Sequence, residues 1–182
     1  MKKIAAALLL AVMAVPAYSA EEGFYAGINA GRSKADSNIG SIVLNKSNDT
    51  SYGLLLGYQF DKNFAFEAQY TSFGNFESPY FNGKNEALGL SVVGSMPVAE
   101  GFSLYAKLGY AHTRTNLSNN VAPVSGTNRS AVTYGIGAQY DVTPAIGLRL
   151  GWDQYGAALK DNSGNTRNFK ISNWNLGAIF KF

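Results

Sequence analysis

The chain lacks cysteine altogether and has a single histidine among its 182 residues. Without cysteine it cannot form a disulfide, bind a metal through thiolates or carry out thiol chemistry. One histidine, with no carboxylates clustered at ligand spacing, also fails to give the pattern of a metal site. The sequence therefore predicts a protein with no metal, no cofactor and no disulfide framework.

Long hydrophobic runs are also missing beyond the N-terminus. The apolar stretch Ile4–Val15 is shorter than the roughly 20 residues that a helix needs to cross a bilayer. It follows Lys2 and Lys3 and is followed by Ala17-Tyr18-Ser19, in which small residues flank a tyrosine. A positive start, an apolar core and a small-x-small motif are typical of a secretory signal peptide.

We expect cleavage after Ser19, or alternatively after Ala20, which makes residues 1–19 a leader and 20–182 the mature domain. Removal of two lysines lowers the formal net charge from +3 to +1. The mature chain is thus nearly neutral, and it has no basic patch of the kind that binds nucleic acid. A mean hydropathy of -0.08 argues against a helical membrane protein but is compatible with a membrane barrel.

The chain does have residues that alternate with period two, most clearly at its end. One side of the last nine residues carries Trp174, Leu176, Ala178, Phe180 and Phe182, and the other carries Asn175, Gly177, Ile179 and Lys181. This period predicts a β-strand with one apolar face. In a soluble protein such a strand would leave an exposed edge, whereas in a barrel it pairs with the first strand.

The same alternation recurs and predicts eight strands, each about 9 to 11 residues long, the length that crosses the hydrocarbon of a bilayer. The predicted strands lie near residues 24–31, 52–60, 64–71, 88–96, 104–111, 132–140, 146–153 and 174–182. Short turns at 61–63, 97–101 and 141–145 alternate with long polar loops at 33–49, 74–85, 116–129 and 156–167. Membrane barrels have short periplasmic turns and long outer loops in this alternation.

The sidedness of these strands distinguishes a membrane barrel from a soluble one. Bulky residues occupy even positions, whereas the odd positions are mostly glycine, small, polar or charged. A soluble eight-stranded barrel would place its apolar residues inside. Aromatic residues gather toward both ends of the strands, as at the two interfaces of a membrane. We therefore predict an all-β fold, a closed eight-stranded antiparallel up-and-down transmembrane β-barrel.

Several motifs resemble the OmpA-like transmembrane domain and other small outer-membrane β-barrels. They are Gly57–Phe60, Phe66–Tyr70, Leu104–Gly109, Leu148–Leu150 after Thr143-Pro144, and Leu176–Phe182. The resemblance implies a location in the cell outer membrane and a non-enzymatic structural or surface-interaction role. The sequence contains no counterpart of the peptidoglycan-binding domain of OmpA, so we expect a barrel-only protein without a cell-wall tether.

Five polar residues are predicted to point into the barrel: Glu67, Lys107, Gln139, Arg149 and Asp153. An eight-stranded barrel has an interior just wide enough for side chains to fill, and buried charges must be paired. We expect a structural ion-pair network, with a small solute pore as the alternative. The resemblance places Glu67 and Arg149 in an interior charge network, whereas Val93 and Gln139 stand where the family often has Lys and Glu.

Three outward cations, Arg32, Arg114 and Lys170, lie at the loop ends of their predicted strands. Because closure places the first and last strands side by side, we expect Arg32 and Lys170 to be neighbours. Arginine and lysine at this height would bind the phosphates of lipopolysaccharide. The polar loops carry no recognisable ligand signature, so a host or phage ligand is left open.

The lone histidine, His112, is predicted to face lipid near the loop end. Some eight-stranded barrels modify lipid A with serine and histidine, but catalysis of this type needs a base beside the hydroxyl. No serine lies two residues from His112 on the same face, so we predict no catalytic site and leave a lipid A-modifying enzyme as the less favoured alternative. The terminal residues Trp174, Leu176, Phe180 and Phe182 resemble the signal read by the barrel-assembly machinery.

Overall fold

The computed structural model describes residues 22–35, 48–78, 81–118, 127–160 and 166–182. These residues form eight strands: β1 (Gly23–Ala35), β2 (Asn48–Asp61), β3 (Phe64–Ser78), β4 (Phe81–Ala99), β5 (Phe102–Ser118), β6 (Thr127–Thr143), β7 (Ile146–Lys160) and β8 (Thr166–Lys181). None of the described residues belongs to a helix long and apolar enough to cross a membrane. The predicted leader, residues 1–19, lies outside the described part.

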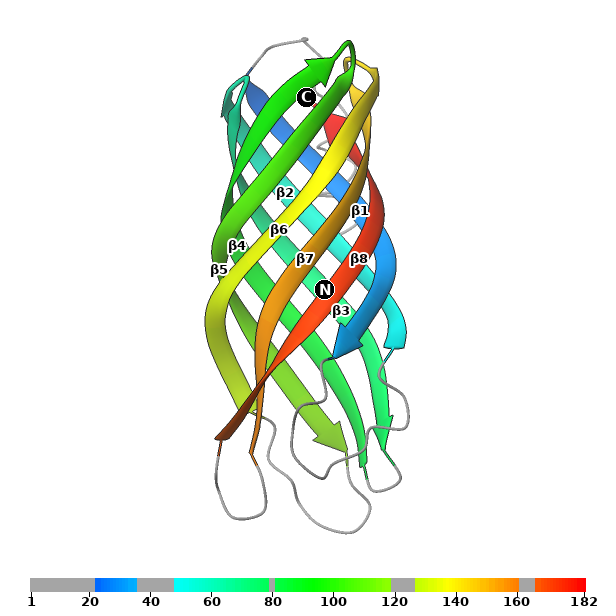
Figure 1. The fold of residues 1–182 in the computed structure, drawn as a ribbon, viewed down its shortest axis with the longest axis vertical. Helices are drawn as coiled ribbons and strands as arrows, with labels where there is room; N and C mark the ends of the chain where they lie inside the picture. Colours follow the sequence, from blue (N-terminus) through cyan, green and yellow to red (C-terminus); the bar gives the residue numbers. More distant parts are fainter. Residues whose placement is uncertain (1–21, 36–47, 79–80, 119–126, 161–165) are drawn as a thin grey trace, which may run out of the picture.

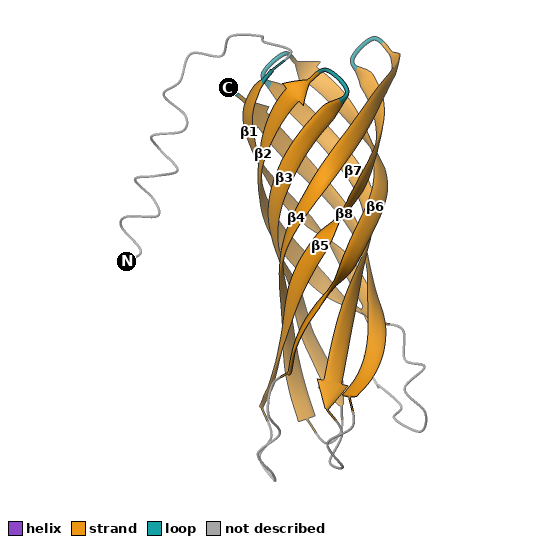
Figure 2. Cartoon of the chain, turned by 90° about the vertical axis from the view of Figure 1, so that its left-hand side faces the viewer, coloured by secondary structure: helices purple, strands orange, loops and turns teal. Residues whose placement is uncertain are grey.

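Each strand pairs with the next in antiparallel fashion, and β1 pairs with β8 to close the barrel (Figure 1). The closing register places Ala26 opposite Phe180 and Arg32 opposite Trp174. At the chain end the Phe182 amide donates a hydrogen bond of 2.9 Å to the Phe24 carbonyl oxygen. The predicted closed eight-stranded up-and-down topology is confirmed, and Figure 2 shows its tilted strands from the side.

Bulky apolar side chains cover the outside of the barrel. Leu176 is 63% exposed, whereas the neighbouring Asn175 is 7% exposed. Among the strand residues whose side chains are described, every buried residue has an odd number, and every even-numbered residue is exposed or half-buried. Hydrocarbon is the environment that such an outer face requires, because in water this much apolar surface would aggregate. The predicted sidedness is therefore confirmed.

The two ends of the barrel differ in their connections. At one end, which we call the turn end, two residues separate β2 from β3, β4 from β5, and β6 from β7. Gly101 has a φ of 71° there, a left-handed conformation that glycine adopts without strain. The strand ends that these turns do not join, Ala35 and Asn48 among them, lie at the opposite end, which we call the loop end.

The strands are longer than predicted, with 13 residues in β1 and 19 in β4. Most of the loop predicted at 74–85 is strand, and Lys84 pairs with Asn116 of β5. Polar sequence suggested loops at these positions. Beyond the bilayer, however, both faces of a strand tolerate polar side chains, while its backbone groups still gain from pairing. What remains of the predicted loops lies outside the described residues.

The inner face is also less uniformly polar than predicted. It contains two layers of buried apolar side chains. The inner layer, nearer the turn end, consists of Tyr25, Leu55, Ala65, Val93, Tyr105 and Ile179. The outer seal, nearer the loop end, consists of Phe73, Ala87, Ala111, Tyr155, Ala157 and Ile171. The larger members of the outer seal lie just beyond the predicted strand ends, which is why the alternation did not assign them to the interior.

Candidate functional site

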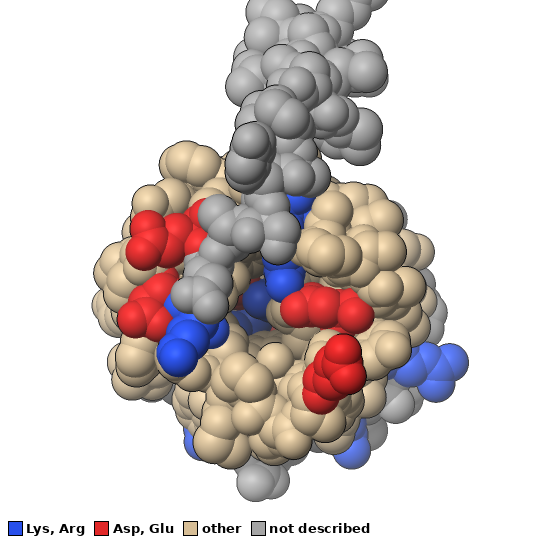
Figure 3. Space-filling model, turned by 90° about the horizontal axis from the view of Figure 1, so that it is seen from above, with Lys and Arg blue, Asp and Glu red and all other residues tan. Residues whose placement is uncertain are grey.

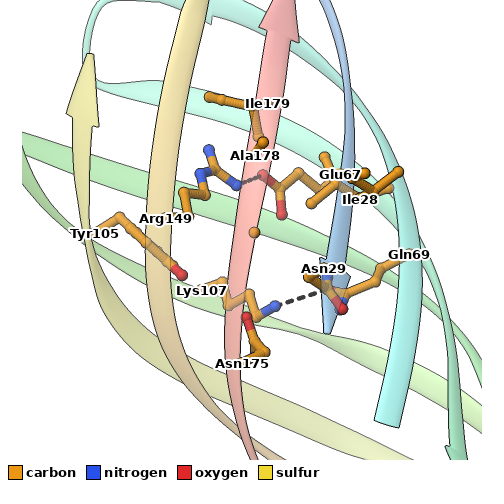
Figure 4. A pocket seen from close by; sticks show the side chains of 12 residues that line it. Ile28, Asn29, Glu67, Gln69, Tyr105, Lys107, Arg149, Asn175, Ala178 and Ile179 are labelled. Carbon is orange, nitrogen blue, oxygen red and sulfur yellow. Dashed lines mark hydrogen bonds and ion pairs between the residues drawn. The ribbon is translucent and has the colours of Figure 1, made fainter. Parts of the chain in front are cut away.

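The first buried ion pair joins Arg149 of β7 to Glu67 of β3 across the lumen (Figure 4). The side chains are 9% and 1% exposed. Arg149 Nε also donates a hydrogen bond of 2.8 Å to Gln139 Oε1, because Gln139 lies directly opposite it on β6. The Tyr25 hydroxyl donates one of 2.7 Å to Glu67 Oε1. The Arg149 guanidinium also lies 4.9 Å from the centre of the Tyr105 ring, which adds a cation–π contact.

The second buried ion pair joins Lys107 of β5 to Asp153 of β7, with 2.9 Å between Nζ and Oδ1. Lys107 Nζ also donates a hydrogen bond of 2.7 Å to Gln69 Oε1. Asn175 Nδ2 donates one of 2.9 Å to Asp153 Oδ2. The two acids and two bases neutralise one another, so these four side chains bring no net charge into the membrane interior. This pairing is what burial of charge in a low dielectric requires.

A third set of polar contacts reaches the turn end. Gln139 Nε2 donates to Asp141 Oδ1 at 2.7 Å, and Asp141 Oδ2 pairs with Lys181 Nζ at 2.7 Å. Viewed from this end, acidic and basic side chains gather around the mouth of the lumen (Figure 3). Polar contacts therefore run without a break from Lys181 at the mouth to Glu67 in the interior.

All five predicted interior residues point inward, and the structure joins them into two groups rather than one. One group holds Glu67, Gln139 and Arg149, and the other holds Lys107 and Asp153. The prediction omitted the partners, namely Tyr25, Gln69, Asp141, Asn175 and Lys181. Each partner has an odd number, so alternation alone carried the signal that they face inward.

Little space remains between the charged side chains. The cavity lined by Glu67, Lys107 and Arg149 has a volume of about 10 Å³. A volume of roughly 10–15 Å³ on this measure is needed to hold a single water molecule. In this structure the charged side chains therefore leave no open passage at this level of the lumen.

The three predicted outward cations are all exposed at the loop end, but Arg32 and Lys170 are not neighbours. Arg32 lies opposite Trp174, four residues along β8 from Lys170. The residue diagonal to Lys170 is Lys34, which lies opposite Ser172 and is also exposed. Closure of the barrel was anticipated correctly, but the offset between its first and last strands was not. Arg114 lies elsewhere on the circumference, on β5.

The serine that the sequence did not place beside His112 comes from the neighbouring strand. The register of β5 and β6 sets His112 opposite Ser130, and its Nδ1 lies 2.8 Å from the serine Oγ. Serine–histidine catalysis also needs a group that orients the base. The residue opposite His112 on β4 is Leu88, which cannot do so. Among the described residues no carboxylate is hydrogen-bonded to His112, so the structure shows a serine–histidine pair without the third member of a triad.

The predicted assembly residues lie on the outside of β8. Trp174 and Leu176 are 60% and 63% exposed, and Phe180 and Phe182 are half-buried near the turn end. Pairing of β8 with both β1 and β7 fixes this face toward lipid. Recognition of these residues by the barrel-assembly machinery stays a prediction.

A closed barrel with an apolar exterior and a neutralised charged interior defines a transmembrane protein of an outer membrane. The family model described as "Outer membrane protein beta-barrel domain" matches residues 5–182, and the chain belongs to this family. The predicted location in the cell outer membrane and the resemblance to small outer-membrane barrels are thereby confirmed.

Individual relatives agree with this assignment. Outer membrane protein P5 of Haemophilus influenzae is 27% identical over 215 residues, which cover 100% of this chain and 61% of the relative. The chain thus spans 61% of that protein's length. The fold is similar to that of Neisserial surface protein A, with a TM-score of 0.68 and 21% identity over 88% of this chain and 97% of the other. It is also similar to Ail of Yersinia pestis, solved with the heparin analogue sucrose octasulfate, with a TM-score of 0.62 and 20% identity over 90% and 100% of the two chains.

Proposed function

We propose that this protein is a non-enzymatic outer-membrane barrel that supports the envelope structurally and binds anionic partners at the cell surface. The observation that carries the proposal is the uneven charge of its two ends. Among the residues whose side chains are described, six basic ones lie toward the loop end, Arg32, Lys34, Lys84, Arg114, Arg129 and Lys170, against two acidic ones, Asp49 and Glu86. Toward the turn end the balance reverses, with Lys62 and Lys181 against Glu22, Asp61, Glu100 and Asp141.

Short turns face the periplasm in barrels of this kind, so the loop end with its excess of bases faces outward. A positive surface attracts anions and binds them through charge-assisted hydrogen bonds. The phosphates of lipopolysaccharide surround the barrel at this height, and anionic sugars can reach it from outside. Ail, a barrel of similar fold, was solved with a sulfated ligand, and this supports the proposal that the present barrel binds anions. The buried ion pairs, in turn, serve the stability of the barrel.

The seam between β8 and β1 is the part of this surface that we assign to lipopolysaccharide. Arg32, Lys34 and Lys170 are exposed there, and Trp174 lies opposite Arg32 on the adjacent strand. An aromatic side chain at the interface with cations beyond it suits a lipid whose acyl chains adjoin phosphates. Arg114 would make a separate contact on β5.

Replacing all three seam cations by glutamine should weaken binding of purified lipopolysaccharide to the detergent-solubilised protein by roughly tenfold. This figure assumes about 0.5 kcal/mol for each exposed charged contact. The affinity of the native protein should also fall as salt is raised. Lys62→Gln, a change at the turn end, serves as the control and should leave binding unchanged. Equal affinity in the triple variant and the control would disprove the seam as the binding site.

A solute pore is poorly supported, because the charged side chains leave a cavity of only about 10 Å³ between them. The enzymatic alternative has one specific observation in its favour, the contact between His112 and Ser130. The lack of a carboxylate hydrogen-bonded to His112 among the described residues argues against it.

Expression of the native chain should therefore leave the acyl chains of lipid A unchanged, and the Ser130→Ala variant should give the same lipid A. Mass spectrometry of lipid A from cells with and without the protein measures this directly. A mass loss or gain of one acyl chain with the native protein, abolished by Ser130→Ala, would show that the barrel is an enzyme.

A further inference from the structure

The outer seal consists of three large and three small side chains that meet inside the barrel. They come from β3, β4, β5, β7 and β8, and each is between 0% and 4% exposed. The rings of Phe73 and Tyr155 meet edge to face, with 4.9 Å between their centres. Ile171 of β8 is fully buried in the same cluster, and three alanines complete it. These six side chains form one apolar cluster inside the barrel.

A β-bulge fixes the position of Phe73. Three residues of β3 span the distance that two residues of β4 span, because the pairing steps from Ser72 opposite Glu86 to Asn75 opposite Lys84. The extra residue allows Gly74 to take a φ of 75°. A Cβ on Gly74 would lie 2.6 Å from the carbonyl oxygen of Thr50, so no other residue fits without displacement.

A buried hydrogen bond from β1 also holds the backbone of β3 at Phe73. The hydroxyl of Ser33 on β1 donates to the Phe73 carbonyl oxygen at 2.8 Å. Ser33 is 0% exposed and is therefore part of the interior at this level. The bulge and this bond together keep the Phe73 ring directed across the lumen.

The outer seal lies on the loop side of the charged interior. Along β3, Phe73 comes two residues after Thr71, and along β7, Tyr155 comes two residues after Asp153. Along β8, which runs the other way, Ile171 precedes Asn173 by two residues. The residues on the turn side of the seal, Thr71, Asp153 and Asn173, are all polar and buried. A polar section of the lumen, packed with side chains and called the polar chamber below, thus begins directly behind the outer seal.

We propose that the outer seal is the permeability barrier of this barrel, and that the buried ion pairs, although closely packed behind it, stabilise the barrel without being the barrier to ions. An apolar constriction excludes ions because it cannot replace their hydration. Charged side chains, by contrast, can accept water and ions between them when they move. Removing the outer seal should therefore let ions enter the polar chamber and pass among the mobile charged side chains and the inner-layer residues Tyr25 and Tyr105 that contact them. Neutralising an ion pair behind an intact seal should not open this path.

The absence of cysteine makes the barrier directly measurable. In a Thr71→Cys protein the reporter thiol lies in the chamber, two residues behind Phe73. We expect a charged, membrane-impermeant thiosulfonate to leave it unlabelled in the folded protein. With Phe73→Ala and Tyr155→Ala added, labelling should reach completion in the time that labels a Ser130→Cys control on the exposed surface.

Conductance in planar bilayers gives the second measurement. The seal variant Phe73→Ala/Tyr155→Ala should show discrete openings, whereas the native protein and the ion-pair variant Glu67→Gln/Arg149→Met should show none. Heat-dependent migration on gels verifies that each protein is folded. If the double seal variant does not fold, Ile171→Ala and Gly74→Ala replace it, with Gly94→Ala as the matched control because a Cβ there meets nothing closer than 3.7 Å.

Three outcomes would overturn the proposal: a labelled reporter in the native protein, a folded seal variant that stays closed, or an ion-pair variant that conducts with its seal intact. None of them bears on the cationic surface, so the proposed surface function would stand in each case. A closed native protein that opens only when the seal is removed is the result the structure leads us to expect.

Discussion

Replacing Glu67 by alanine should destabilise the barrel by about 3–5 kcal/mol, the usual cost of removing one partner from a buried ion pair. Arg149 would be left 8% exposed with its charge unmatched. The Tyr25 hydroxyl would also lose the carboxylate oxygen to which it donates at 2.7 Å. Because a buried donor that loses its acceptor cannot form a hydrogen bond with water instead, both losses add to the free-energy cost.

Reversible unfolding by urea in lipid vesicles measures this difference in the free energy of unfolding. Two comparisons sharpen it. Removing both charges with Glu67→Leu and Arg149→Met should cost much less than the single change, because apolar replacements often substitute for a buried pair. Lys181→Ala breaks a pair whose side chains are 28% and 27% exposed, and should cost less than about 1 kcal/mol. A Glu67→Ala protein no less stable than Lys181→Ala would contradict a structural role for the interior pair.

Replacing Leu150 by arginine should destabilise the barrel by about 2–4 kcal/mol in lipid, the cost of a cation near the middle of the hydrocarbon. Leu150 is 53% exposed on the outer face and lies between Ala138 and Leu176 on the flanking strands. The same charge is accommodated one residue earlier, at Arg149, because that side chain points inward to Glu67.

Ser130→Arg is the control for this change, because Ser130 is exposed toward the loop end, where the cost should fall to about 0–1 kcal/mol. The measurement is again the free energy of unfolding in vesicles. Similar costs at positions 130 and 150 would mean that Leu150 does not lie in hydrocarbon.

Alternation was sufficient to predict the fold, because the period of a strand is exactly two residues and each face meets one environment. The same rule put Glu67 and Arg149 inside and Leu150 outside without any knowledge of strand pairing. It also marked Tyr25 and Asn175 as inward. Alternation could not predict that Glu67 pairs with Arg149, because these residues come from strands that are not adjacent in the sheet.

Register and strand length could not be predicted in the same way. The offset between neighbouring strands brings His112 into contact with Ser130. It also separates Arg32 from Lys170 along β8. That offset is set by closure of the barrel and by bulges such as the one at Gly74, which alternation does not encode. Phe73 was missed because the strand containing it continues through a polar sequence that predicted a loop.

Even-numbered side chains of the strands meet lipid and odd-numbered side chains meet one another inside the barrel, and the role of every residue described above depends on this sidedness. Single spin labels at successive positions of β7, from Ile146 to Asp153, measure this directly in a chain without native cysteine. Collision with oxygen, which dissolves in lipid, should rise at every even position and fall at every odd one. The opposite phase, with label 148 shielded from oxygen and label 149 exposed to it, would contradict this sidedness of the barrel.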